Sequence, residues 1–180
     1  LTYQPPTYVN FDKKISTPCG DANPQDIGPF YCPDNATVYL DLIDIQNSVL
    51  PYGLFLVAVV AAHETGHHIE ELLNLTYCPK QCAGGYSNEQ WELMADCFAG
   101  GWAKDVNTRG GIDVGGLEDA IVGTAAFLGD PPAAVNDMPS TDAHGPGSLR
   151  TWWFLQGYFE GPTICPTINQ PTPEGTPAAG

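Results

Sequence analysis

The chain has 180 residues, of which 21 are Asp or Glu and only 6 are Lys or Arg, giving a formal net charge of −15. A surface this acidic repels nucleic-acid phosphates and anionic lipid headgroups, so we expect no nucleic-acid partner. The length fits one domain with a sizeable core, and a hydrophobic content of 43% argues against a disordered chain.

The first part of the chain is expected to be mostly irregular. Proline recurs through residues 1–36, which predicts an extended, loop-rich segment. The stretch ATVYLDLI, residues 36–43, is rich in β-branched, aromatic and apolar residues and predicts a strand.

Helical patterns dominate the rest of the chain. The helix expected at 53–75 is apolar on nearly every face at its start, which predicts a central, buried position. A helix at 87–106 opens with Ser87 and Gln90, the spacing of a capping box. Two more helices are expected, at 115–130 and at 147–161, the latter with Ser148 as N-cap.

The C-terminal tail, residues 162–180, is rich in proline and threonine and is expected to be extended. We therefore predict a domain over residues 1–165, followed by a proline-rich tail over 166–180. The fold class is α+β: a helix-dominated single domain with a small sheet.

Six cysteines in an acidic chain rich in proline and glycine favour disulfides and an oxidising compartment. The sequence alone does not choose among the many pairings. We expect two bonds that close short loops and one that fastens the C-terminal segment to the domain. The expected pairs are Cys19–Cys32, Cys78–Cys82 and Cys97–Cys165. A thiolate zinc site at CPKQC is the alternative, but no second pair of cysteines stands at a matching distance.

The motif HETGH, residues 63–67, carries the chemistry. His63 and His67 are four residues apart, so on a helix they share a face and can hold one metal ion. Glu64 points about 100° around the helix, where its carboxylate can act as general base toward a water molecule. The pattern is short enough to arise by chance, but its place on a helix expected to be buried favours metal chemistry.

A third ligand must come from elsewhere, because hydrolytic zinc sites use three protein ligands and leave one position open. On the next helix, Glu92 and Asp96 are also four residues apart and share a face. Glu92 is the candidate ligand, and Asp96 is placed to orient the ring of His63 through a hydrogen bond. The alternative is an ordinary solvated helix face. Ligands of these types also suit nickel or cobalt.

The two remaining histidines differ in what they suggest. His68 lies about 100° from His67 on the helix and is expected to be a bystander, either hydrogen-bonded or on the surface. His144 lies in a loop before the last helix, where it could reach the site and stabilise an oxyanion. A plain surface position for His144 is equally open.

Several segments resemble the family described as putative neutral zinc metallopeptidase, a zincin of the gluzincin type. The resemblance is carried by CGDANPQDIGPFYCPDNATVYLDL (19–42), AAHETGHHIEELL (61–73) and ELMADCFAGGWA (92–103), with weaker matches at LGDPP and AHGPGSLRTWWFLQGY. It implies that His63, His67 and Glu92 bind zinc and that Glu64 acts as the general base. It implies as well that Asp96 orients a ligand histidine and that His144 donates a hydrogen bond to the transition state. It also implies that 36–43 is a sheet-edge strand that roofs the cleft and pairs with an extended peptide.

We therefore expect a secreted or envelope-located zinc peptidase, an endopeptidase rather than an exopeptidase, acting on peptide or protein substrates. Its cofactor is one catalytic zinc ion. A monomer is favoured, and no apolar run in this chain approaches the ~18 residues of a membrane span. The alternatives are a catalytically silent, disulfide-stabilised secreted domain that binds zinc for interaction, and a disulfide-stapled binding module without metal. An intact Glu64 argues against a silent zinc site, since a structural site needs no base.

Overall fold

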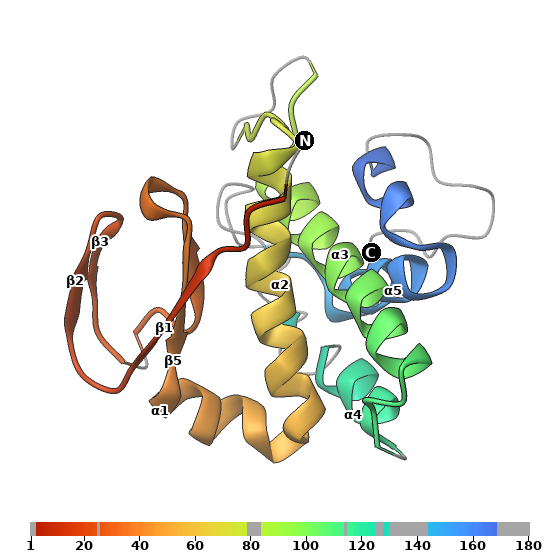
Figure 1. The fold of residues 1–180 in the computed structure, drawn as a ribbon, viewed down its shortest axis with the longest axis horizontal. Coiled ribbons are helices and arrows are strands. Elements are labelled where there is room, and N and C mark those ends of the chain that lie inside the picture. The colour runs from red at the N-terminus through yellow and green to blue at the C-terminus, as the bar shows by residue number, and fades with distance from the viewer. Residues whose placement is uncertain are drawn as a thin grey trace.

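A long central helix, α2 (Leu54–Leu72), divides the molecule into two layers, with the β-strands on one side and the other long helices on the opposite side (Figure 1). This computed structural model describes residues 3–24, 26–78, 84–113, 115–124, 128–129 and 144–168. The α+β, helix-dominated architecture expected from the sequence is confirmed.

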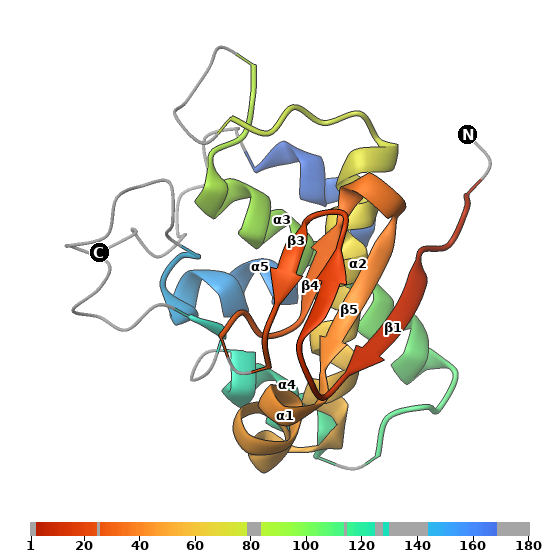
Figure 2. The same cartoon turned by 90° about the vertical axis from the view of Figure 1, so that its left-hand side faces the viewer.

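The strands form two small sheets, seen in front of α2 in Figure 2. In the three-stranded sheet the order is β1 (Thr7–Phe11), β5 (Thr37–Asp41) and β4 (Phe30–Cys32). β1 is parallel to β5, and β4 is antiparallel to it. The other sheet is an antiparallel pair of β2 (Ile15–Thr17) and β3 (Gly20–Ala22).

The strand predicted at 36–43 is present as β5, but its expected position at the sheet edge is wrong. β5 has hydrogen-bonded neighbours on both sides and is buried at Thr37, Val38, Tyr39 and Asp41. Within the described residues β1 and β4 each pair with β5 alone, so these two are the edge strands of the sheet, and β4 is the one whose residues line the cavity described below.

The loop-rich prediction for residues 1–36 is also wrong in part, because β1 to β4 all lie there. Three of these strands are only three residues long, too short to show a two-residue alternation of polarity. A disulfide between Cys19 and Cys32, one of the expected pairs, links the turn before β3 to the end of β4.

A short helical connection leads from β5 to α2. The buried Asp41 side chain accepts hydrogen bonds from the backbone N–H groups of Ile43 and Asp44 and so caps α1 (Leu42–Asp44). A π-helical turn and a 3-10 turn complete the connection, at Ile45–Val49 and Leu50–Tyr52.

The helices on the other side of α2 are α3 (Asn88–Thr108), α4 (Gly116–Gly123) and α5 (Gly147–Glu160). α3 and α5 match their predictions closely, and the capping box predicted at the start of α3 is present. α4 covers the first part of the predicted helix at 115–130; beyond it Thr124 and Leu128 are π-helical, and residues 125–127 and 130 lie outside those described. The prediction of Ser148 as N-cap is wrong, because the extended residue before α5 is Pro146, which has no capping side chain.

Glycines allow the three long helices to approach closely. A Cβ on Gly66 of α2 would lie 2.8 Å from the Cα atom of Ala95 on α3. Gly100 of α3 and Gly157 of α5 face backbone carbonyls of the partner helix in the same way. Around these contacts the core fills with apolar side chains from several helices, including Leu56 and Phe154.

The C-terminal segment folds back on α3. A disulfide joins Cys97 to Cys165, as expected, and the latter lies in a 3-10 helix, Pro162–Thr167. The extended conformation predicted for 162–180 is therefore wrong for its first residues, and residues 169–180 lie outside those described. The expected Cys78–Cys82 pair cannot be placed, since Cys82 lies outside the described residues too. Among the described helices, none combines the length and apolar character needed to cross a membrane.

Candidate metal centre

The two histidines of HETGH and a glutamate from α3 converge at one point. His63 and His67 stand one turn apart on α2, with ring centroids 4.8 Å apart. Glu92 faces both rings: its Oε2 lies 3.2 Å from Nε2 of His63, and its Oε1 lies 3.7 Å from Nε2 of His67. Candidate ligand atoms of the three residues all lie within 4.8 Å of one another. The structure thus brings together the three residues expected to bind the metal.

Carboxylates hold the outer nitrogens of both rings. Nδ1–H of His63 donates to Oδ1 of Asp96 at 2.8 Å, the contact expected from the sequence. Nδ1–H of His67 donates to Oε2 of Glu70 at 2.9 Å, a contact the sequence analysis did not predict. Because each Nδ1 carries its proton toward a carboxylate, each Nε2 keeps a lone pair directed at the convergence point.

Arg150 of α5 completes the buried network. It was not among the site residues predicted from the sequence. Its Nε and Nη2 donate to the two oxygens of Asp96, at 2.7 and 3.0 Å, and it also bonds the carbonyl of Leu128. Its guanidinium lies 3.6 Å from Oε2 of Glu92. Only 2% of Arg150 is exposed. The arginine thus ties Asp96, and through it His63, to α5.

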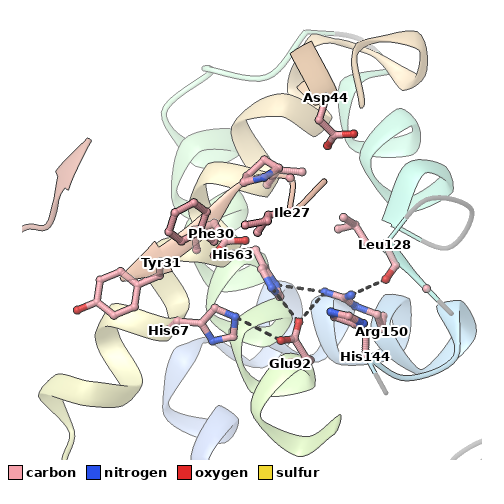
Figure 3. A pocket seen from close by; sticks show the side chains of 15 residues that line it. Ile27, Phe30, Tyr31, Asp44, His63, His67, Glu92, Leu128, His144 and Arg150 are labelled. Atoms are coloured by element: carbon pink, nitrogen blue, oxygen red, sulfur yellow. Dashed lines mark hydrogen bonds and ion pairs between the residues drawn. The ribbon is translucent and has the colours of Figure 1, made fainter. Parts of the chain in front are cut away.

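A cavity of about 530 Å³ opens over this cluster (Figure 3). The three candidate ligands and Glu64, which is 8% exposed, line it together with the edge strand β4. His144 and Leu128 stand at one side of the cavity and Tyr31 at the other. The structure therefore places Glu64 and His144, the residues expected to do the chemistry, in the same cavity as the ligands.

The carboxyl groups of the site differ in proton affinity. Burial raises the pKa of the Glu64 carboxyl, and nearby histidine charges offset this only in part. Burial also opposes ionisation of Glu92, but the His63 hydrogen bond and the charge of Arg150 help to hold its pKa well below the usual range. Asp96 behaves likewise, because the charges of Arg150 and His63 outweigh its burial and lower its pKa. Glu92 and Asp96 are thus suited to remain ionised acceptors, and Glu64 to take up a proton.

His68 has no part in this cluster, in agreement with its expected bystander role. It is buried, its Nε2–H donates to the carbonyl of Gln4 at 2.7 Å, and its Nδ1 lies 2.8 Å from the hydroxyl of Tyr31. It therefore links the N-terminal segment and β4 to the side of α2 that faces the strands.

The sequence contains signals for Glu70 and Arg150, the two residues of the site that were not predicted. Glu70 follows His67 by three positions, which places the two on one helix face. Arg150 is the only Lys or Arg after residue 109, and it lies on the same helix stripe as the buried Trp153 and Phe154. A cation in that position needs a buried acidic partner.

The donor set fits zinc. Catalytic zinc sites combine three histidine or carboxylate ligands with one open position, and carboxylates commonly orient the ligand histidines. Here His63, His67 and Glu92 are the candidate ligands, two carboxylates orient the rings, and the cavity lies on the open side. Fold and site together define a candidate metal centre on two helices, open to a cavity.

Comparison with known protein families agrees with a zinc site. Residues 1–168 match the family described as putative neutral zinc metallopeptidase, and the chain belongs to that family. Uncharacterized protein YpfJ of Escherichia coli (strain K12) is 33% identical over 184 aligned residues, which cover 94% of this chain and 63% of the relative. Uncharacterized protein Rv2575 of Mycobacterium tuberculosis (strain ATCC 25618 / H37Rv) is 34% identical over 187 residues, covering 93% and 64%. The chain spans less than two thirds of these relatives' lengths. No solved structure matches it.

Proposed function

We propose that this domain is a zinc-dependent endopeptidase. The observation that carries the proposal is the buried carboxyl of Glu64 in the same cavity as a three-residue metal-ligand set. When bound by His63, His67 and Glu92, zinc supplies a Lewis acid that polarises a peptide carbonyl and makes water more acidic.

The chain's own residues perform the proton transfers. Glu64 takes a proton from the attacking water and delivers it to the nitrogen of the leaving amine. His144 lies in the cavity wall, where an N–H can stabilise the negative oxygen that develops on the attacked carbonyl. Asp96 and Glu70 keep the ligand rings oriented during this cycle.

The edge strand β4 supports an extended peptide as the substrate. Phe30 and Tyr31 of β4 line the cavity, so a peptide that adds to this edge passes over the metal ligands. A second cavity continues beyond His67 and Glu92. Space on both sides of the ligand cluster favours cleavage within a chain over removal of a terminal residue.

Location and assembly belong to the same proposal. The disulfides Cys19–Cys32 and Cys97–Cys165 favour an extracytoplasmic site of action, either secreted or in the cell envelope. We propose that the domain acts there as a monomer on peptide or protein substrates.

Glu64→Gln tests the mechanism. The amide cannot accept the proton, so we expect peptide hydrolysis to fall by about 10²–10⁴-fold, while zinc content measured by metal analysis stays at the wild-type level. Glu118→Gln on the exposed face of α4 makes the same chemical change away from the site and serves as the control. A fully active, zinc-loaded Glu64→Gln variant would remove Glu64 from the mechanism.

A further inference from the structure

A second cavity, of about 390 Å³, adjoins the metal centre on the side away from Arg150. Its walls include Tyr31, His67 and Glu92, which also line the first cavity. Figure 3 shows Tyr31 and His67 at one end of the first cavity, opposite Leu128 and His144. A side chain bound in the second cavity would therefore lie directly beside the metal ligands.

The outer wall of this second cavity is aromatic and held in place. The rings of Tyr77 and Trp91 lie 5.5 Å apart at a tilt of 55°. The hydroxyl of Tyr77 donates to Oδ1 of Asn88 at 2.9 Å. Backbone hydrogen bonds run from Cys78 N–H to the carbonyl of Tyr86 and from Tyr86 N–H to the carbonyl of Thr76, next in sequence to Tyr77. The wall is thus already formed before any ligand binds, which lowers the entropic cost of binding.

The charged groups of this second cavity are acidic. Glu71 and Glu92 both line it, and among the described residues of its lining there is no Lys or Arg. Glu92 faces the metal-ligand histidines, which leaves Glu71 to face a ligand. Glu71 is exposed and accepts a hydrogen bond from the hydroxyl of Tyr31. A net charge of −15 over the whole chain adds to the negative potential.

We propose that this second cavity is a specificity subsite for an arginine or lysine side chain next to the bond that is cleaved, an inference that rests on the proposed peptidase function. The aliphatic stem packs on Leu75, and the cationic head lies against the rings of Tyr77 and Trp91 within reach of Glu71. A neutral side chain gains the apolar contacts alone.

The test measures kcat/KM on matched peptides that differ only in one residue flanking the cleaved bond: arginine, lysine or methionine. Methionine retains an unbranched stem without the charge. We expect wild type to prefer the basic peptides, and Glu71→Gln to lower that preference by about 10-fold or more while methionine peptides are cleaved as before. Glu118→Gln, which loses the same charge elsewhere, should keep the wild-type preference.

A further variant separates charge from geometry. Tyr31→Phe removes the hydrogen bond to Glu71 but keeps the charge of Glu71, so the basic preference should persist in this variant. Zinc content of each variant confirms that the metal centre is unchanged. If wild type cleaves no peptide, the proposed function fails. If wild type cleaves peptides without a basic preference, or Glu71→Gln keeps that preference, only the subsite assignment is overturned.

Discussion

At the scale of single residues, the decisive feature is a buried cation that pairs with a buried carboxylate. Arg150 bonds both oxygens of Asp96, and both residues are buried; Glu92, which lies close to Arg150, has a side chain that is 14% exposed. Burying charges is costly, and such a set is stable only when every member keeps its partner. Arg150 therefore compensates the negative charges of Glu92, the candidate ligand, and of Asp96, which holds the His63 ring.

Replacing Arg150 by methionine tests this role. Methionine fills similar space but leaves Asp96 and Glu92 without their cation, so we expect the free energy of unfolding to fall by about 3–5 kcal/mol. Urea unfolding of the metal-free protein gives the measurement. The control is Arg109→Met, which breaks the exposed pair with Asp105 and should cost at most about 1 kcal/mol. Equal losses in the two variants would contradict a special role for Arg150.

The sequence predicted those parts of the site that depend on local spacing. His63 and His67 share a face because they are four residues apart on one helix, and Glu92 and Asp96 follow the same rule on the next. Arg150 could not be placed in this way, because its contact with Asp96 depends on how α5 packs against α3. The spacing of Arg150 on α5 indicates that its side chain is buried, but it does not show which acidic residue on another helix it meets.

At the scale of elements, the distance between α2 and α3 decides whether the ligands meet. Gly66 lies between the ligand histidines in sequence, and its missing Cβ lets α3 approach at Ala95. Glu92 lies about one turn before Ala95 on α3, so the same contact sets the separation between Glu92 and the histidine rings. Close packing of α2 against α3 thus explains why a glycine stands at position 66 of HETGH.

Gly66→Ala should therefore weaken both the fold and the metal site. Alanine favours an isolated helix by up to about 1 kcal/mol, but here its Cβ would meet the backbone of Ala95 and force the helices apart. We expect a net loss of about 1–3 kcal/mol in unfolding free energy and lower zinc affinity by titration with a competing chelator. A stabilised variant with unchanged affinity would show that the contact does not set the spacing.

The sheet shows where prediction from sequence fails at this scale. Long helices with sustained periodicity were predicted to within a few residues, whereas β2, β3 and β4 have three residues each and give no readable pattern. The edge position assigned to β5 failed because strand order depends on which segments pair, and the parallel partner β1 comes from the N-terminal segment. The edge strand that lines the cavities is β4, whose Tyr31 borders both of them.

At the scale of the whole molecule, the candidate metal centre is a product of the complete fold. Its candidate ligands lie on α2 and α3, the buried Arg150 comes from α5, and residues of β4 line the cavity. The Cys97–Cys165 disulfide fastens the segment after α5 to α3, next to Asp96. An unfolded chain presents no such arrangement, so zinc should bind the folded state far better and stabilise it by linkage.

Zinc at about 100 times its dissociation constant should then add about 2.7 kcal/mol of stability and raise Tm by roughly 5–10 °C over the chelator-treated protein. Thermal unfolding followed by circular dichroism, with and without zinc, measures the shift. Glu92→Ala removes a ligand and should lose most of the shift. Glu64→Gln should keep it in full, because Glu64 lines the cavity but is not one of the three candidate ligands. A shift that survived in Glu92→Ala, or vanished in Glu64→Gln, would reverse the roles assigned to the two glutamates.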